Sequence, residues 1–568
     1  MQNVSRRSFV AGSAMAAGAV AAAGAAAPCL ADEAGQDGIT SAQALSKWSF
    51  EIAPAGITDD QIAETIEAEI IVVGAGTGGL VVANSAADEG ADVILVTASS
   101  IPISRGGSNH ATYSKTMEAL GIDRNDASYY QRELLANGSR VDTRKWYRYF
   151  NASEEAMNWL IDIMEAKGYT TGLETAVPTI DDGAIFYLPG AHGFYNDENP
   201  GMGMNQPLIV NELAARLEEK TGKPVYYKNI ARQLVRGGVA NGTEGAVEAV
   251  ICEREDGTYA KYVGTKGIVL ATGDFSCDYE MMAKYAPQAI KYITPEFFDA
   301  EVNYDKTFVY GGLYKGDGQK MGLWVGAAWQ KAYPCCPNGG GVNAGGPMCG
   351  ITPFTGVNLT REGKRFSNEY GFLGTNFFTN EIACPGGVEY SIWDVNYAEQ
   401  YPLQWFDGSA PWGTDSAKTA ETVLSEWESS VEAGTYFKAD TLEELIDMLG
   451  LPAEETLATI AKYNEDCAAG EDTEFHKDPR FMIPVDKAPF YGAKGTSSLF
   501  LTILGGLRTD DHMRVCDEDD NPIEGLYNVG SMVGDMYYAE YTYMIPGFTY
   551  GSSITLSYLL GKELAAAE

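Results

Sequence analysis

A glycine-rich turn between an apolar run and a helical run constrains the fold of this chain more than any other feature. Residues 69–80 read EIIVVGAGTGGL, and a second apolar run, DVILV, occupies residues 92–96. The pattern predicts a strand, a tight turn, a helix and a second strand, which together form a βαβ unit. In such a unit Gly74 permits the turn, Gly76 lets a pyrophosphate approach the backbone, and Gly79 permits close helix–strand packing. The sequence therefore predicts a dinucleotide site with the pyrophosphate at the helix N-terminus.

The residue after the second run departs from the usual pattern. Dinucleotide-binding units place an acidic residue at the end of the second strand, where it binds the ribose. Thr97 occupies that place in this chain, and Ser99 follows two residues later. The sequence therefore assigns ribose binding to Thr97, Ser99 or backbone groups.

Strand and turn signals recur later in the chain and are separated by a region of different character. Residues 266–275 and 525–531 each read as a strand that ends in a glycine turn. Between them lie an irregular stretch rich in Gly, Pro and Cys and then helical patterning near 417–470. This alternation predicts an α/β domain that is interrupted by a separate unit and completed by the C-terminus. The expected limits are a leader at 1–31, a polar lead-in with a short amphipathic helix at 32–66, the first part of the α/β domain at 67–327, the inserted unit at 328–495 and the second part at 496–568.

Residues 1–31 have the features of an export signal. Arg6 and Arg7 precede an apolar run rich in Ala and Gly, and an acidic pair follows it. A twin arginine before a weakly apolar run is typical of the pathway that exports proteins after they have folded around a cofactor. We therefore expect a twin-arginine export signal and a protein of the cell envelope or extracytoplasmic space. No membrane span of its own is expected, because the run is short and Ala-rich.

The charge, the cysteines and the histidines exclude several classes of protein. The formal net charge of −38 repels the phosphates of nucleic acids and of anionic lipids. No cysteine has the spacing of a haem-attachment motif, and the four histidines lack metal-ligand spacing, so neither haem nor a metal site is expected. A cysteine cluster in the Gly/Pro-rich region leaves an iron–sulfur centre open, although buried thiols suit its spacing better. Its members are Cys335, Cys336, Cys349 and Cys384.

Several further motifs resemble one family of flavoproteins, that of fumarate reductase, succinate dehydrogenase and 3-ketosteroid dehydrogenase. After the glycine turn they follow the family's order: RGGSN at 105–109, LATGDF at 270–275, LTREGKRFSNE at 359–369, GLYNVGS at 525–531 and a final helix that begins SSITLSYLLG. The resemblance implies FAD and an α/β fold, with a Rossmann-like FAD-binding domain interrupted by a smaller α+β capping domain. His110 does not stand where some relatives attach the flavin covalently, so non-covalent FAD is expected.

By the same resemblance, the residues expected to bind FAD come from five parts of the chain. They are Gly74, Gly76, Thr77 and Gly79 in the first turn, Thr97 after the second strand, Ser104, Arg105, Gly106, Gly107 and Ser108 in the RGGSN loop, Ala271, Thr272 and Gly273 in LATGDF, and Gly530, Ser531 and Ser553 near the C-terminus.

The chain departs from this family at the positions where fumarate reductases bind and protonate a dicarboxylate with His and Arg. Tyr333 stands at a His position, Leu373 at the proton-donating Arg, Thr502 at a second His and Tyr543 at the last Arg. Desolvation of a dicarboxylate without such partners would cost several kcal/mol of binding free energy per charge. The expected substrate is therefore uncharged.

The segment YMIPG at 543–547 indicates a different kind of site. It resembles the Tyr-x-x-Pro-Gly of 3-ketosteroid dehydrogenases, in which the Tyr hydroxyl and the Gly backbone N–H bind a carbonyl oxygen. The resemblance makes Tyr543 and Gly547 the expected catalytic donors, with Tyr333 as a second hydroxyl at the pocket wall. Glu369 is a further catalytic candidate, although salt-bridge or capping roles suit Glu369 and Arg365 of the cap motif as well.

The sequence thus predicts a FAD-dependent oxidoreductase of CH–CH groups that saturates an activated C=C bond of a neutral, hydrophobic enone or α,β-unsaturated lactone. Steroids and cardiac glycosides are substrates of this kind. An external electron donor is expected, such as a membrane-anchored cytochrome. Three alternatives stay open: a 3-ketosteroid dehydrogenase that works in the oxidative direction, a fumarate-reductase-like respiratory reductase of another unsaturated compound, and a flavin-carrying electron-transfer protein with a degenerate site.

Overall fold

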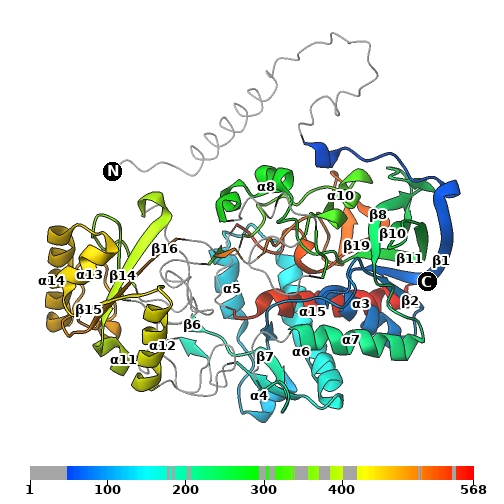
Figure 1. Ribbon diagram of the computed structural model, residues 1–568. Coiled ribbons are helices and arrows are strands. Elements are labelled where there is room, and N and C mark those ends of the chain that lie inside the picture. Colours follow the sequence, from blue (N-terminus) through cyan, green and yellow to red (C-terminus); the bar gives the residue numbers. More distant parts are fainter. Residues whose placement is uncertain are drawn as a thin grey trace, which may run out of the picture. The chain divides into compact units, whose positions relative to one another are not determined.

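The structure is a computed structural model of the chain (Figure 1). Tyr543, Leu373, Cys349 and the predicted leader lie outside the residues that it describes. Within the described residues, no helix combines the length and the apolar character that a membrane crossing needs. The described residues are 48–174, 179–181, 186–200, 206–292, 298, 302–305, 314–336, 338–339, 356–369, 384–400, 419–496, 499–500, 502–539 and 545–567.

A mixed eight-stranded sheet is the base of the nucleotide-binding domain. β1 is parallel to both of its neighbours, β2 and β11, and β19 is parallel to the C-terminal end of β11. Ile70, Ile71 and Val72 of β1 are fully buried. This burial on both faces explains why the strand reads as a continuous apolar run. The strands are β1 (Ile62–Val73), β2 (Val93–Val96), β8 (Asn229–Arg236), β9 (Val239–Ala240), β10 (Val247–Arg254), β11 (Tyr259–Leu270), β18 (Arg514–Cys516) and β19 (Pro522–Asn528).

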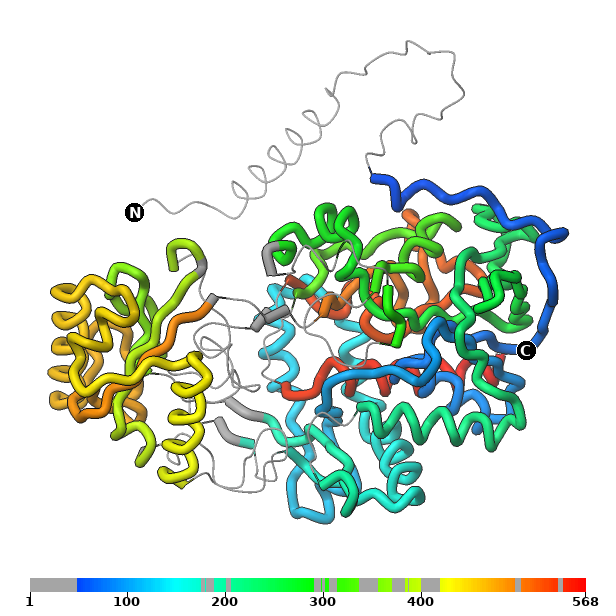
Figure 2. The backbone as a smooth tube through the Cα atoms, in the orientation of Figure 1, coloured from blue at the N-terminus to red at the C-terminus, as the bar shows by residue number. Residues whose placement is uncertain are grey.

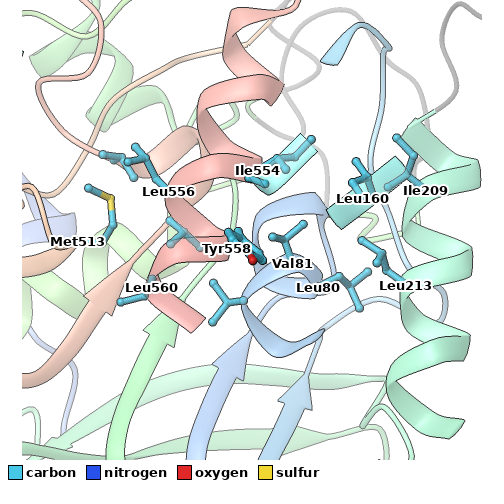
Figure 3. Packing of buried hydrophobic residues seen from close by; sticks show 14 of the residues in the cluster. Leu80, Val81, Leu160, Ile209, Leu213, Met513, Ile554, Leu556, Tyr558 and Leu560 are labelled. Atoms are coloured by element: carbon cyan, nitrogen blue, oxygen red, sulfur yellow. The ribbon is translucent and has the colours of Figure 1, made fainter. Parts of the chain in front are cut away.

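The first helix of the βαβ unit, α3 (Thr77–Asp88), is buried over almost its whole length. It packs against α15 (Phe548–Ala566) and α7 (Gln206–Thr221), and α15 also packs against α6 (Thr143–Ala166). Figure 2 shows the C-terminal helix, in red, beside the N-terminal βαβ unit, in blue. Figure 3 shows the shared core, in which apolar side chains of all four helices meet. The labelled ones include Leu80, Val81, Leu160, Ile209, Leu213, Ile554 and Leu560.

A small antiparallel sheet carries the loop that follows Ser104. It consists of β3 (Asn109–His110), β7 (Ala191–Tyr195) and β4 (Thr170–Leu173), in the order β3-β7-β4. Helix α4 (Lys115–Ala119) contacts β4. The N-terminus of α15 contacts β3 through a hydrogen bond of 3.1 Å from the His110 N–H to the Gly547 carbonyl. This sheet therefore fixes the RGGSN loop against the start of the last helix.

The region of different character forms a second core of its own. Its described residues form a four-stranded antiparallel sheet in the order β13-β14-β16-β15 and four α-helices. Trp393, Trp427 and Tyr491 are among its buried aromatic residues. This combination of sheet and helices matches the expected α+β unit. The residue boundaries predicted for each unit stay predictions. The elements are β13 (Val357–Leu359), β14 (Val388–Asp394), α11 (Asn396–Gln400), α12 (Ala420–Glu432), β15 (Phe437–Ala439), α13 (Leu442–Leu449), α14 (Ala453–Ala469) and β16 (Phe490–Thr496).

The structure describes only part of the polar lead-in predicted at 32–66, so the short helix expected there stays a prediction. The described part, residues 48–66, contains two short 3-10 helices and no α-helix, and β1 already begins at Ile62. The reason is the long partner strand β11, because Ile62 pairs with Tyr259 and Ile66 with Tyr262 in parallel register. The remaining elements are α5 (Ala127–Ala136), β5 (Ile180–Asp181), β6 (Phe186–Tyr187), α8 (Tyr279–Tyr285), α10 (Asp317–Trp324), β12 (Asn338–Gly339) and β17 (Leu499–Phe500).

Candidate active site

The predicted nucleotide turn lies between β1 and α3, and two of its glycines are required by the fold itself. Gly74 has φ +117°, and a Cβ there would collide with the carbonyl of Ala271. A Cβ at Gly79 would collide with the carbonyl of Gly74. Ala271 is held at this point because its N–H donates to the Val73 carbonyl at 2.8 Å. The turn is therefore packed tightly against the end of β11.

Gly76 differs from these two glycines because the space beside it is open. Its backbone is extended, with φ −85° and ψ 178°, and it is the N-cap of α3. The nearest atom to a Cβ at this position would be the Ile103 carbonyl oxygen at 3.4 Å, an ordinary contact. A glycine N-cap has no side-chain acceptor for the first-turn N–H groups, which suits an external anion such as a pyrophosphate. The residues of this turn thus fit the phosphates of FAD.

The other predicted FAD residues of the C-terminal part also lie at this turn. A Cβ on Gly78 would be 3.2 Å from the Ser553 hydroxyl and 3.4 Å from Cα of Gly530. The carbonyl of Ser531 accepts a hydrogen bond of 2.7 Å from the Gly505 N–H. Thr97 lies at the end of β2, where its hydroxyl is 2.9 Å from that of Ser99. Whether these two hydroxyls bind the ribose stays a prediction.

Buried hydrogen bonds tie the RGGSN loop to the nucleotide turn. The Thr77 hydroxyl is 2.8 Å from both the Ser104 hydroxyl and the Gln206 side-chain oxygen. The Gln206 amide donates to Asn109, and the Tyr550 hydroxyl donates to the Arg105 carbonyl. Gln206 and Tyr550 were not among the residues expected from the sequence. Their roles depend on long-range contacts, and neither residue belongs to a recognisable motif.

A buried charge cluster lies next to the loop and was also not expected. Asp274 is 1% exposed, and its Oδ2 accepts a hydrogen bond of 2.8 Å from the Thr502 hydroxyl. Its Oδ1 accepts one of 2.9 Å from Ser276, and Arg105 forms an ion pair with Oδ2 at 3.7 Å. Asp274 lies in the turn that follows β11, which ends at Leu270, and this position beyond the carboxyl end of a strand was the signal that could have revealed it.

Tyr314 completes the surroundings of Asp274. A Cβ on Gly273 would lie 2.6 Å from its ring, so the ring covers this turn. Burial raises the pKa of the Tyr314 hydroxyl to about 12, and the Asp274 carboxylate adds to the effect. The site therefore combines a neutral phenol with a carboxylate that is already paired.

Gly547 is the N-cap of α15 and takes a left-handed conformation with φ +76°. A Cβ at this position would lie 2.7 Å from the carbonyl of Ser108, so the RGGSN loop and the start of α15 are in direct contact. The last helix thus begins beside the loop that is expected to face the flavin. Tyr543, the expected partner of Gly547, lies outside the described residues.

The motif around Tyr333 is joined to the segment that carries Thr502. Gln330 accepts a hydrogen bond of 2.8 Å from the Gly506 N–H, and a larger residue at Gly505 would collide with the same Gln330 side chain. Tyr333 itself is 63% exposed. The structure thus places this side chain in contact with solvent, and its expected role at the pocket wall stays a prediction.

Glu369 lies in a buried ion cluster of the inserted unit. Its two carboxylate oxygens accept hydrogen bonds of 2.8 and 2.7 Å from Arg365. The same guanidinium donates to both oxygens of Asp472, at 3.0 and 2.8 Å. This geometry favours the structural alternative for Glu369 over a catalytic role.

The iron–sulfur centre that the cysteine cluster left open receives no support from the described residues. Among them, no three or more His, Cys, Asp or Glu side chains are grouped so as to hold a metal ion. Cys349 lies outside these residues. The cluster stays a prediction.

Comparison with known proteins places the chain in one family. Residues 69–540 match the family described as "FAD binding domain". The chain is 30% identical to an NADH:acrylate oxidoreductase of Vibrio harveyi over 60% of its own length, but it spans only 31% of that relative. It is 25% identical to a vinyl phenol reductase of Lactiplantibacillus plantarum over 83% of its own length and 91% of the relative.

A solved structure supports the fold. The 3-ketosteroid-Δ4-(5α)-dehydrogenase of Rhodococcus jostii RHA1, in complex with 4-androstene-3,17-dione, has a TM-score of 0.65 to this chain at 21% identity, covering 91% of this chain and all of that one. With the glycine turn and the matched family, this likeness confirms a mixed α/β FAD-binding fold. The chain therefore belongs to the FAD binding domain family, and its cofactor is FAD.

Proposed function

We propose that this protein is a FAD-dependent reductase that saturates an activated C=C bond in a neutral, hydrophobic enone or α,β-unsaturated lactone of the steroid or cardiac glycoside kind. The observation that carries the proposal is the pairing of Arg105 with buried Asp274, which also binds Thr502. Bound FAD supplies the hydride chemistry of such a reaction. The residues of the chain supply the binding, the orientation and the electrostatics.

The charge cluster opposes an anionic substrate. Thr502 stands where fumarate-reducing relatives are expected to use a His, and its hydroxyl is already donated to a carboxylate. The positive charge of Arg105 is offset by the same carboxylate. A substrate carboxylate near these residues would meet a like charge in a poorly solvated place, which costs several kcal/mol in interfaces of this kind. A neutral substrate avoids that cost.

The start of α15 favours a carbonyl group instead. Gly547 precedes a helix of 19 residues, and the N-terminus of a helix carries a partial positive charge. Hydride addition to the β-carbon of an enone moves negative charge onto the carbonyl oxygen. Backbone donors that are fixed before the reaction stabilise such charge, and one donor contributes about 3 kcal/mol. Contact with Ser108 fixes Gly547 in this way.

Two of the three named relatives are consistent with this class, whereas the third is named for acrylate, a carboxylate. The vinyl phenol reductase bears the name of a neutral alkene, and the dehydrogenase of known structure was solved with a steroid ketone. The second of these also keeps the oxidative direction as a second candidate function. The same proposal includes an external electron donor, such as a membrane-anchored cytochrome. It also includes export through the twin-arginine pathway, which the sequence of residues 1–31 supports.

A substrate panel tests the proposal. Protein reduced under anaerobic conditions is mixed with fumarate, a cinnamate, an unsaturated ketosteroid or an unsaturated lactone, and flavin reoxidation is followed by absorbance. We expect reoxidation by the lactone or the ketosteroid and none by fumarate. Reoxidation by fumarate alone would refute the neutral-substrate assignment. Bleaching of the oxidised flavin by a saturated ketosteroid, without turnover of either enone, would establish the oxidative direction.

Tyr543→Phe tests the proposed carbonyl site. Removal of the hydroxyl deletes one of two donors, so we expect turnover to fall by at least about tenfold with unchanged FAD content. Steady-state kinetics with the best substrate of the panel measure this. A variant that retains full turnover would remove Tyr543 from the mechanism, and loss of FAD would assign it to the cofactor site instead.

Asp274→Asn tests the charge argument. The amide keeps the shape and an acceptor for Thr502 but removes the charge that pairs with Arg105. We expect fumarate to bind at least about tenfold more tightly than to the unaltered protein, since a nearby unit charge is worth a few kcal/mol even in a polar interior. Perturbation of the flavin absorbance during titration measures the affinity. Ser276→Ala is the matched control, because it removes a hydrogen bond to the same carboxylate and leaves the charge in place. Equal fumarate affinity in both variants would contradict the argument.

A further inference from the structure

Glu174 is a buried carboxyl group that the proposed function does not use. It follows β4 directly and is 4% exposed. Its N–H donates to the Ala191 carbonyl at 2.9 Å, which fixes its backbone on the small sheet. Its Oε1 accepts a hydrogen bond of 2.6 Å from the Ser108 hydroxyl. A buried carboxyl group held by one neutral hydroxyl is costly to ionise.

The charged and titratable groups around Glu174 are engaged elsewhere. On β7, the ring nitrogens of His192 contact the Ser114 hydroxyl and the Gly190 carbonyl, each at 2.7 Å. On β3, His110 contacts the Tyr149 hydroxyl at 2.6 Å. Burial lowers the pKa of His110 to about 3 and that of His192 to about 4, so both are neutral near pH 7.

The helix that contacts β4 offers no offsetting charge either. Lys115, at the start of α4, is paired with Asp162 and Glu165 at 2.6 and 2.8 Å. Glu118 of the same helix is exposed. Burial therefore dominates and raises the pKa of Glu174 to about 8, against a smaller opposite effect of the Ser108 hydrogen bond. The carboxyl group keeps its proton at pH 7 and loses it as the pH rises through about 8.

Ser108 connects this carboxyl group to the active site. It takes a left-handed conformation with φ +64°, which is uncommon for a residue with a side chain. Its backbone touches Gly547, while its hydroxyl points away to Glu174. Ser108 thus contacts the proposed carbonyl site through its backbone and the buried Glu174 through its hydroxyl.

We propose that Glu174 is a proton reservoir of the redox reaction, linked to the reacting centre through the Ser108 hydroxyl. Saturation of a C=C bond consumes one hydride and one proton. The external donor supplies the electron pair, and solvent supplies the proton that makes this pair a hydride. In the structure the Ser108 hydroxyl donates to Glu174. For the transfer this hydroxyl rotates, as hydroxyl groups can, so that Glu174 donates to the Ser108 oxygen. The Glu174 O–H bond then breaks as that oxygen gains the proton, the Ser108 hydroxyl hydrogen leaves toward the reacting centre, and a proton from solvent restores the acid. The role rests on the binding of FAD and not on the substrate class.

A redox titration without any substrate tests this role and is independent of the proposed function. The midpoint potential of the bound FAD is measured between about pH 6 and pH 10, a range that spans the ionisation of Glu174. Its pH dependence gives the number of protons that the protein takes up per two electrons. Negative charge gained on reduction raises the proton affinity of a nearby acid. We expect the unaltered protein to take up as much as one proton more than Glu174→Gln above about pH 8. The exposed Glu118→Gln is the matched control and should behave as the unaltered protein. Identical proton uptake in Glu174→Gln and the unaltered protein would overturn the proposal.

An infrared difference spectrum provides a second test that needs no variant at position 174. At pH 8 to 9, the reduced-minus-oxidised spectrum of the unaltered protein should contain a band of a protonated carboxyl group, and that band should shift in Ser108→Ala, which lacks its hydrogen bond. A spectrum without such a band, or a band that Ser108→Ala leaves unchanged, would contradict the proposed link.

Discussion

A Gly76→Val protein is expected to fold normally and to be purified with much less bound flavin than the unaltered protein. The extended backbone of Gly76 is open to any residue, and a Cβ there meets the protein only at 3.4 Å. The added side chain would instead fill the space at the N-cap of α3 that the pyrophosphate needs. Overpacking of a tight site costs about 1–3 kcal/mol. We therefore expect affinity for FAD to fall by about 10- to 100-fold.

Gly79→Val is the matched control for this prediction, because it adds the same side chain to the same turn but at a position where the protein leaves no room for it. A Cβ at Gly79 collides with the Gly74 carbonyl, so the fold itself is damaged. Absorbance of the bound flavin and thermal unfolding, measured on both variants, separate the two effects. A yellow Gly76→Val protein with full flavin content would contradict the assigned pyrophosphate site. A cooperatively folded Gly79→Val protein that binds FAD would contradict the packing argument.

The same turn shows why much of the fold could be predicted from the sequence. The positive φ of Gly74 and the demands on Gly76 and Gly79 are local, since each follows from the short path between a strand and the next helix, whereas the contact of Gly74 with Ala271 is not. The apolar run of β1 likewise reports burial on two faces. The start of β1 was harder to predict, because residues 62–66 become a strand only through pairing with β11, nearly 200 residues later.

The electrostatics of the site could not be predicted in the same way. Asp274 was visible in the sequence, but its pairing with Arg105 and Thr502 joins three segments far apart in the chain. The contact of Glu174 with Ser108 depends on a small sheet whose strands give little periodic signal. Charge and proton affinity arise from such contacts, so they follow from the tertiary structure and not from any motif.

The buried ion cluster of the inserted unit leads to the second large prediction. The Arg365 side chain bonds both Glu369 and Asp472 and lies between two aromatic rings, with its guanidinium carbon 4.9 Å from the ring centre of Tyr463 and 4.8 Å from that of Phe475. Burial alone would raise the pKa of Asp472, but the bonds from Arg365, together with hydrogen bonds from the backbone N–H groups of Phe475 and Lys477, hold that pKa below its usual range. The guanidinium is thus the main partner of two buried carboxylates.

Arg365→Met is expected to destabilise the inserted unit by about 3–5 kcal/mol, because it leaves both carboxylates buried with too little positive charge. Lys477, 3.6 Å from Glu369, offsets only part of this loss. Denaturant unfolding followed by tryptophan fluorescence, which reports on Trp393 and Trp427 in this core, measures the change. Lys364→Met is the matched control, because Lys364 is 62% exposed in its pair with Glu455 and such surface pairs contribute about 0–1 kcal/mol. Equal stability of the two variants would mean that the cluster does not hold the unit together, and it would return Glu369 to the list of catalytic candidates.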